Sequence, residues 1–144
     1  MMKKKILILC TGNSCRSQMA EGFVNHFGGE NFEGVSAGSH PAEAVHPIAI
    51  KVMKEEGIDL SQNQPKHLTS FLEEHIDYLV TVCDNAKESC PNFPANVTHF
   101  HWSFEDPALA EGTEEEVLNS FRKIRDQIKD KFVSFMEKEL RVKS

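Results

Sequence analysis

The sequence predicts an α/β fold built on a mostly parallel sheet. Segments with strand patterns alternate with segments with helical patterns along the chain, an order typical of folds in which helices connect parallel strands. The first strand candidate, residues 4–10, contains the unbroken apolar run ILIL, as expected of a central strand covered on both faces. A length of 144 residues suits one core, so we expect residues 1–144 to form a single domain.

Three further segments have strand character: FEGVSAG at 32–38, IDYLVTVC at 76–83 and NVTHFHW at 96–102. In open parallel sheets the active site lies outside the carboxyl ends of the strands. Cys10 and Cys83 end the first and third candidate strands. We therefore expect both cysteines at the same edge of the sheet.

The longest helices are expected at 14–29 and 113–140. In the first, Gly28 marks the end. One face of this helix carries five apolar residues, namely Met19, Ala20, Phe23, Val24 and Phe27. In the second, Thr113 is the expected N-cap and acidic residues occupy the first turn.

A third helix is expected at 46–58, with Pro47 in its first turn and Gly57 at its end. Residues 67–74, HLTSFLEE, predict a shorter helix. No repeat, low-complexity tract or linker interrupts this order of elements.

The composition is that of a globular protein, with 40% hydrophobic and 26% charged residues. The net charge of −6 argues against nucleic acid or an anionic membrane as a partner. The start, MMKKKILILC, has a basic head, but its apolar stretch is shorter than the roughly 7–15 residues of a signal-peptide core. We expect a cytoplasmic monomer, in which four cysteines serve catalysis, redox chemistry or metal binding rather than structural disulfides.

The segment CTGNSCRS, residues 10–17, connects the first strand to the first helix. The first N–H groups of a helix lack internal partners and attract anions. Gly12 and Asn13 tolerate the positive φ of a tight turn, and Arg16 adds a bidentate fork. The same positive field lowers the pKa of Cys10 and favours its thiolate. We expect an oxyanion to be bound by Thr11, Gly12, Asn13, Ser14, Cys15, Arg16 and Ser17.

The segment CTGNSCRSQMAEG closely resembles the catalytic loop of the low-molecular-weight protein tyrosine phosphatase fold, and most of all that of the thioredoxin-coupled arsenate reductases. The motifs SAG at 36–38, CDNAKESCP at 83–91 and HWSFEDPA at 101–108 resemble the same family, in the same order. The resemblance implies a four-stranded parallel sheet flanked by helices on both faces. It also implies that Cys10 is the nucleophile and Arg16 the oxyanion ligand.

Cys83 and Cys90 lie seven positions apart. On a helix their Cα atoms would be about 10.5 Å apart, whereas a disulfide needs roughly 4.4–6.8 Å, so a bond between them requires this segment to change shape. A zinc site from all four cysteines and inert buried thiols are the alternatives to a redox relay. The resemblance places the resolving cysteines of a relay at Cys83 and Cys90, and it makes Cys15 an accessory thiol.

Asp106 precedes Pro107, which by itself is a common turn signal. The resemblance makes Asp106 the general acid, with Glu105 as the neighbouring alternative. None of the seven histidines belongs to a recognisable metal motif, and no cofactor is expected. His99 and His101 are interpreted as ordinary strand residues, and Trp102 as a packing residue near the acid.

One branch of the family binds potassium beside the loop, through residues like Asn13 and Ser36 and through an aspartate whose position falls near Lys66. Our hypothesis is that the Lys66 ammonium replaces the ion. A solvated surface lysine is the alternative.

Arsenate reduction by Cys10, Cys83 and Cys90, with thioredoxin as reductant, is the leading function that the resemblance implies. A phosphatase for phosphotyrosine or small phosphoesters is the alternative. Phosphatases of this fold usually carry a tyrosine after the Asp-Pro pair, where this chain has Ala108 and Leu109. A non-enzymatic oxyanion or redox sensor is a third reading, opposed by the full set of nucleophile, arginine and acid.

Overall fold

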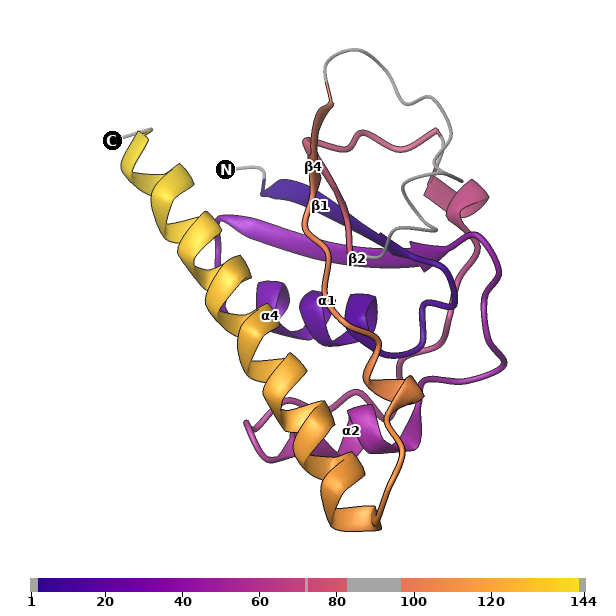
Figure 1. Cartoon of the computed structure of the whole chain (residues 1–144). Coiled ribbons are helices and arrows are strands. Elements are labelled where there is room, and N and C mark those ends of the chain that lie inside the picture. Colours follow the sequence, from indigo (N-terminus) through magenta and orange to yellow (C-terminus); the bar gives the residue numbers. More distant parts are fainter. Residues whose placement is uncertain (1–2, 72, 83–96, 143–144) are drawn as a thin grey trace.

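The computed structural model describes residues 3–71, 73–82 and 97–142. Its centre is a parallel sheet of four strands in the order β2-β1-β3-β4 (Figure 1). The strands are β1 (Lys4–Cys10), β2 (Phe32–Gly38), β3 (Tyr78–Thr81) and β4 (Thr98–His101). The predicted α/β fold with a four-stranded parallel sheet is therefore confirmed.

The central position of β1 follows from its sequence. Residues 6–9 have 0–1% of their surface exposed, which requires cover on both faces because successive side chains point to opposite sides. Cys10 pairs with Gly38 of β2, and Leu9 pairs with Thr81 of β3. The carboxyl ends of the three strands thus meet at one edge of the sheet.

Helix α1 (Arg16–Phe27) packs against β1 and β2. Four of the five residues on the predicted apolar face of α1 are fully buried, whereas Phe27, on the same face, is 46% exposed. Phe27 lies in the last turn, where its ring stacks on Phe23 and lies 5.5 Å below the Lys129 ammonium. The helical spacing of apolar residues continues to the end of α1, whereas the buried part of the helix ends at Val24, one turn earlier.

Helix α2 (Pro47–Lys54) is capped by His46 and ends before the predicted stop. Its chain continues through a turn to Gly57, which has a φ of 79°. The predicted helix at 67–74 is a short 3-10 turn, η1 (Leu68–Phe71). Strands β3 and β4 are also shorter than predicted, and Cys83 lies outside the described residues.

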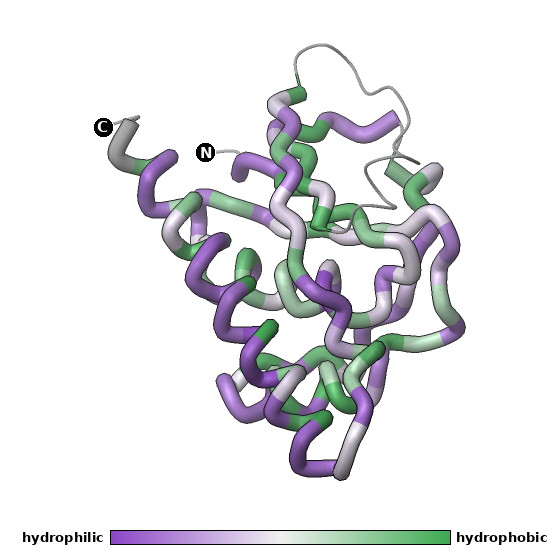
Figure 2. Tube along the Cα trace, viewed as in Figure 1, coloured by the Kyte–Doolittle hydropathy of each residue, from purple (hydrophilic) through white to green (hydrophobic). Residues whose placement is uncertain are grey.

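Helix α4 (Glu114–Val142) begins where the sequence predicts. The Glu116 N–H donates to Thr113 Oγ1 at 3.2 Å, while the Thr113 N–H donates to Glu116 Oε1 at 3.4 Å, a reciprocal cap. An apolar stripe of α4 packs on α1 and α2, with polar residues on the outer side (Figure 2). Trp102 packs against Phe132 and Phe135 of this helix, as expected of a packing residue.

Helices α1, α2 and α4 pack against one another and form one layer (Figure 1). We expected helices on both faces of the sheet; among the described residues, the α-helices lie on one face. None of the described helices has the length and apolar character needed to cross a bilayer.

Candidate active site

The candidate site is built on residues 11–15, which join β1 to α1. Asn13 has a φ of 50°, in the left-handed region, as the sequence predicts; Gly12, the other candidate for such a turn, has no positive φ. The Asn13 side chain stabilises this conformation, because its Nδ2 donates to Ser17 Oγ at 2.8 Å and to Ser36 Oγ at 2.9 Å. The turn is therefore tied both to α1 and to β2.

A second segment, residues 39–46, holds the outer side of this loop. The N–H groups of His40, Ala42 and His46 donate to three loop carbonyls at 2.9–3.0 Å. These carbonyls belong to Thr11, Gly12 and Ser14, respectively. In a trans peptide the C=O and N–H point in opposite directions, so the N–H groups that follow these carbonyls point away from residues 39–46.

Gly38, the last residue of β2, lets the loop approach the sheet closely. A Cβ on Gly38 would overlap the main-chain oxygen of Thr11 and lie 2.8 Å from that of Cys10. Only glycine avoids this contact with backbone atoms. The glycine of the SAG motif thus has a steric role beside the loop.

The loop encloses a small cavity of about 100 Å³. Its lining brings together residues that lie far apart in the sequence, namely Cys10, Gly12, Ser14, Cys15, Arg16, Asp106 and Ala108. Cys10 is 4% exposed at the end of β1. The structure therefore places the predicted nucleophile, oxyanion ligand and acid around one cavity, while Cys83 and Cys90 lie outside the described residues.

Arg16 connects the loop to the segment that carries the acid. Its Nη1 donates to the Phe104 carbonyl at 2.9 Å, and its Nη2 lies 3.6 Å from Asp106 Oδ2. Its Nε is buried and has no hydrogen-bond partner among the described residues. A buried N–H without a partner is costly, and an oxyanion in the cavity would satisfy it.

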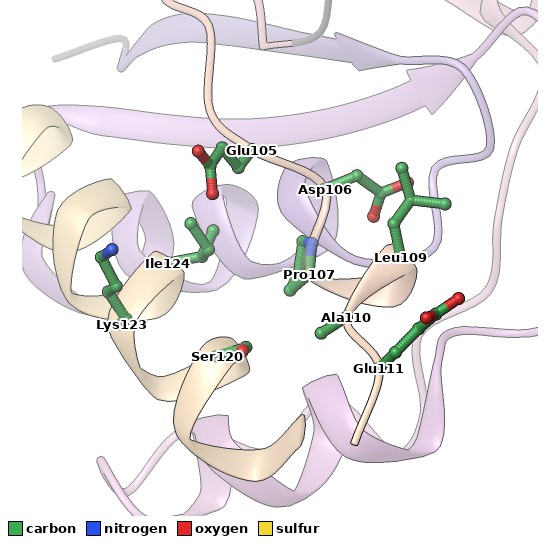
Figure 3. Close-up of a pocket in the computed structure, with 9 residues that line it drawn as sticks. All are labelled: Glu105, Asp106, Pro107, Leu109, Ala110, Glu111, Ser120, Lys123 and Ile124. Carbon is green, nitrogen blue, oxygen red and sulfur yellow. The ribbon is translucent and has the colours of Figure 1, made fainter. Parts of the chain in front are cut away.

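Asp106, rather than Glu105, lines the cavity of Cys10. Asp106 Oδ1 accepts a hydrogen bond from the Ala108 N–H at 3.0 Å and so begins the short turn η2 (Pro107–Leu109). The Glu105 side chain points into a separate cavity of about 480 Å³ between this segment and α4 (Figure 3). Of the two candidate acids, Asp106 is thus the one beside Cys10 and Arg16.

Cys15 lines the cavity but differs from a reactive thiol. Burial, and to a smaller extent the charge of Asp106, raises the pKa of Cys15 to about 11. The thiol is therefore protonated at neutral pH and a poor nucleophile, which agrees with an accessory role.

A buried polar network beneath the loop escaped the sequence interpretation. Glu21 accepts hydrogen bonds from Ser36 Oγ at 2.9 Å and from Asn63 Nδ2 at 3.0 Å, and burial raises its pKa. Gln18 is fully buried beside it. The sequence did not predict that Glu21 and Gln18 are buried, because they have hydrogen-bond partners on β2 and in residues 60–66, far away in the sequence.

Lys66 contacts the loop through its backbone rather than its ammonium. The Lys66 N–H donates to Asn13 Oδ1 at 2.9 Å, whereas the exposed Nζ donates to the Gln64 carbonyl at 3.4 Å. The side-chain atoms of Asn13 and Ser36 are engaged within the protein. The Lys66 ammonium is thus hydrogen-bonded to neither Asn13 nor Ser36, which agrees with the alternative of a solvated surface lysine.

Comparison with known proteins agrees with this geometry. The family model of the low molecular weight phosphotyrosine protein phosphatases matches residues 5–144. An arsenate reductase of Halalkalibacterium halodurans is 46% identical over 137 residues, which cover 95% of this chain and 98% of the relative.

Two solved structures have the same fold. The structure of an arsenate reductase in the oxidized state has a TM-score of 0.80 and 30% identity, and the match covers 94% of this chain and 98% of that one. A thioredoxin-dependent arsenate reductase of Corynebacterium glutamicum has a TM-score of 0.74 and 25% identity, over 100% of this chain and 64% of that one. The chain therefore belongs to the low molecular weight phosphotyrosine protein phosphatase family, within the group formed by these arsenate reductases.

Proposed function

We propose that this protein reduces arsenate to arsenite through a relay of Cys10, Cys83 and Cys90, with thioredoxin as the reductant. The 46% identity to an arsenate reductase along 95% of the chain carries this proposal. The small cavity lined by Cys10, Arg16 and Asp106 supports it, because the cavity combines a thiol, a cation and an acid around the space for one oxyanion.

In the first step the Cys10 thiolate attacks arsenic and an As–S bond forms. Oxide is a poor leaving group, so Asp106 protonates the departing oxygen, which leaves as water. Arg16 and the N–H groups of the loop hold the remaining oxygens. The contact of Asp106 with Arg16, at 3.6 Å, supports this assignment, since an oxyanion bound to the guanidinium would also adjoin the carboxyl group.

In the second step the Cys83 thiolate attacks the sulfur of Cys10. The As–S bond breaks and its electron pair stays on arsenic, which is reduced from As(V) to As(III) and leaves as arsenite. Cys90 then attacks Cys83, which frees Cys10 and leaves a Cys83–Cys90 disulfide. Thioredoxin returns two electrons to this disulfide, and we place the reaction in the cytoplasm, where thioredoxin keeps thiols reduced.

A phosphatase that uses the same cavity is the second candidate function. Ala108 occupies the wall of the cavity, where a phosphatase of this fold would hold an aromatic substrate. Tyr78, the only tyrosine of the chain, is buried in β3 against Phe135. We therefore expect weak side activity on small phosphoesters rather than phosphotyrosine specificity.

Arsenate turnover with thioredoxin, thioredoxin reductase and NADPH tests the proposal. NADPH consumption that requires both arsenate and thioredoxin, and that disappears in Cys10→Ser, is the expected result. Cys10→Ser is the matched control because a serine hydroxyl is not ionised near neutral pH. Hydrolysis of a phosphoester without any arsenate-dependent NADPH consumption would instead favour the phosphatase.

A further inference from the structure

Gln18 is a fully buried polar residue in the first turn of α1, and its side chain reaches back to the loop. Its Nε2 lies within hydrogen-bond distance of three acceptors. These are the main-chain oxygen of Asn13 at 3.2 Å, the Asn13 Oδ1 at 3.1 Å and the main-chain oxygen of Gln64 at 3.3 Å. Its Oε1 accepts from Asn63 Nδ2 at 3.1 Å. The carboxamide thus connects the loop to residues 63–64.

The position of Gln18 completes a pattern around the loop. The carbonyls of Thr11, Gly12 and Ser14 are held by main-chain N–H groups of residues 39–46. The Asn13 carbonyl, between them, is held by the Gln18 side chain. Asn13 is also the loop residue with positive φ, a conformation that a non-glycine residue adopts only when its surroundings hold it there.

We propose that Gln18 is a positioning residue of the oxyanion loop, which fixes the Asn13–Ser14 peptide so that its N–H faces the bound oxyanion. Because C=O and N–H are opposed in a trans peptide, holding the Asn13 carbonyl on one side directs the Ser14 N–H to the other. Ser14 lines the cavity of Cys10. Asn63 supports Gln18 and also binds Glu21, so residues 60–66 brace the loop from below.

The inference deepens the proposed function, on which it relies only for an oxyanion as the ligand. It can be tested without arsenate turnover, with inorganic phosphate as the probe. If the protein does not reduce arsenate, the effect of Gln18 on phosphate binding can still be measured, so the two proposals can fail independently.

The first variant is Gln18→Met, which keeps a similar length and removes every hydrogen bond of the carboxamide. Removal of one oxyanion-hole donor costs about 100- to 1,000-fold in rate. Misorientation of a donor that is still present should cost less, about tenfold in phosphate affinity and in arsenate kcat/KM. We also expect the pKa of the Cys10 thiol to rise, since the loop N–H groups favour its thiolate.

Asn25→Leu is the matched control. Asn25 is also on α1, and its side chain donates to the Gly34 carbonyl at 3.1 Å and accepts from the Gly34 N–H at 2.8 Å. This variant removes two hydrogen bonds between α1 and β2 without touching the loop. We expect a lower Tm with unchanged phosphate affinity and an unchanged Cys10 pKa.

Calorimetry gives the phosphate affinity, and the pH dependence of iodoacetamide alkylation, followed on the Cys10 peptide by mass spectrometry, gives the thiol pKa. Asn63→Ala, which removes the hydrogen bonds to Gln18 and to Glu21 but leaves the Gln18 carboxamide in place, should move both quantities in the same direction by less, and it provides the test if Gln18→Met does not fold. Wild-type phosphate affinity and Cys10 pKa in the folded variants, with only Tm lowered as in Asn25→Leu, would overturn the positioning role.

Discussion

Replacement of Gly38 by alanine should damage the oxyanion loop directly. The added Cβ would overlap the main-chain oxygen of Thr11 and lie 2.8 Å from that of Cys10 and 3.1 Å from the nitrogen of Asn13. All three neighbours are backbone atoms, so no flexible side chain can move aside. The loop itself must shift, and residues that contact the oxyanion must shift with it.

The cost in stability can be estimated from overpacking, which typically amounts to about 1–3 kcal/mol. For a chain of this length we expect Tm to fall by about 3–9 °C. The effect on function should be larger, because a misplacement of about 1 Å can cost about 100-fold in rate. We therefore expect arsenate kcat/KM to fall by about 10- to 100-fold, with phosphate affinity reduced in parallel.

Gly34→Ala separates these two effects. Gly34 lies in the same strand, about 13 Å from Gly38 at about 3.3 Å per residue, and a Cβ there would lie 2.9 Å from Val24 Cβ. This variant should lose a similar amount of stability and keep its phosphate affinity. Thermal unfolding and phosphate calorimetry on both variants decide the matter: equal Tm losses with unchanged phosphate affinity in Gly38→Ala would refute the reasoning.

Three further predictions concern thiols and cations. The folded state keeps the Cys15 proton up to a pKa of about 11, whereas the unfolded chain releases it near the ordinary value of 9.0. Unfolding free energy should be intact below pH 9 and should fall by about 2 kcal/mol as the pH rises to 11; chemical denaturation should show a smaller fall in Cys15→Ala. In the relay, Cys83→Ser should release little arsenite, while Cys90→Ser should release about one arsenite per enzyme and stall as a Cys10–Cys83 disulfide. Mass spectrometry after a single turnover identifies the trapped species, and sustained turnover by Cys90→Ser would contradict this order. Because the Asn13 and Ser36 side chains are hydrogen-bonded within the protein, kcat/KM measured in KCl and in NaCl of equal ionic strength should be similar, and strong activation by potassium would show that a cation site is present.

The sequence alone was sufficient for features that depend on near neighbours. The apolar run at 6–9 predicted a central strand, and the strand is buried as expected. Thr113 predicted the start of α4, and its hydroxyl caps that helix. Of Gly12 and Asn13, the two residues expected to tolerate a positive φ in the loop, Asn13 has one. Each of these features depends on the conformational preferences of a few adjacent residues, which can be read directly from the sequence.

The tertiary structure was needed to locate the ends of elements and to show which of two adjacent acidic residues lies beside Cys10. Helical spacing placed Phe27 on the apolar face of α1, but this residue is 46% exposed because the packing surface ends one turn earlier. Asp106 and Glu105 are adjacent acidic residues, yet only Asp106 lines the cavity of Cys10. Arg16 donates a hydrogen bond to the carbonyl of Phe104, which lies 88 positions away and close to Asp106 in the sequence. No local sequence pattern predicts such a contact.

The sequence by itself thus determined the order of strand, loop CTGNSCRS and helix, and it predicted which residues the structure gathers around one cavity, namely Cys10, Arg16 and Asp106. Only the tertiary structure decided how the loop is held. Its carbonyls are bound by residues 39–46 and by Gln18, and its approach to β2 depends on Gly38. The physical reason is that a loop's peptide orientations are set by hydrogen bonds and steric contacts from segments that are distant in sequence, and these exist only once the sheet has brought the strand ends together.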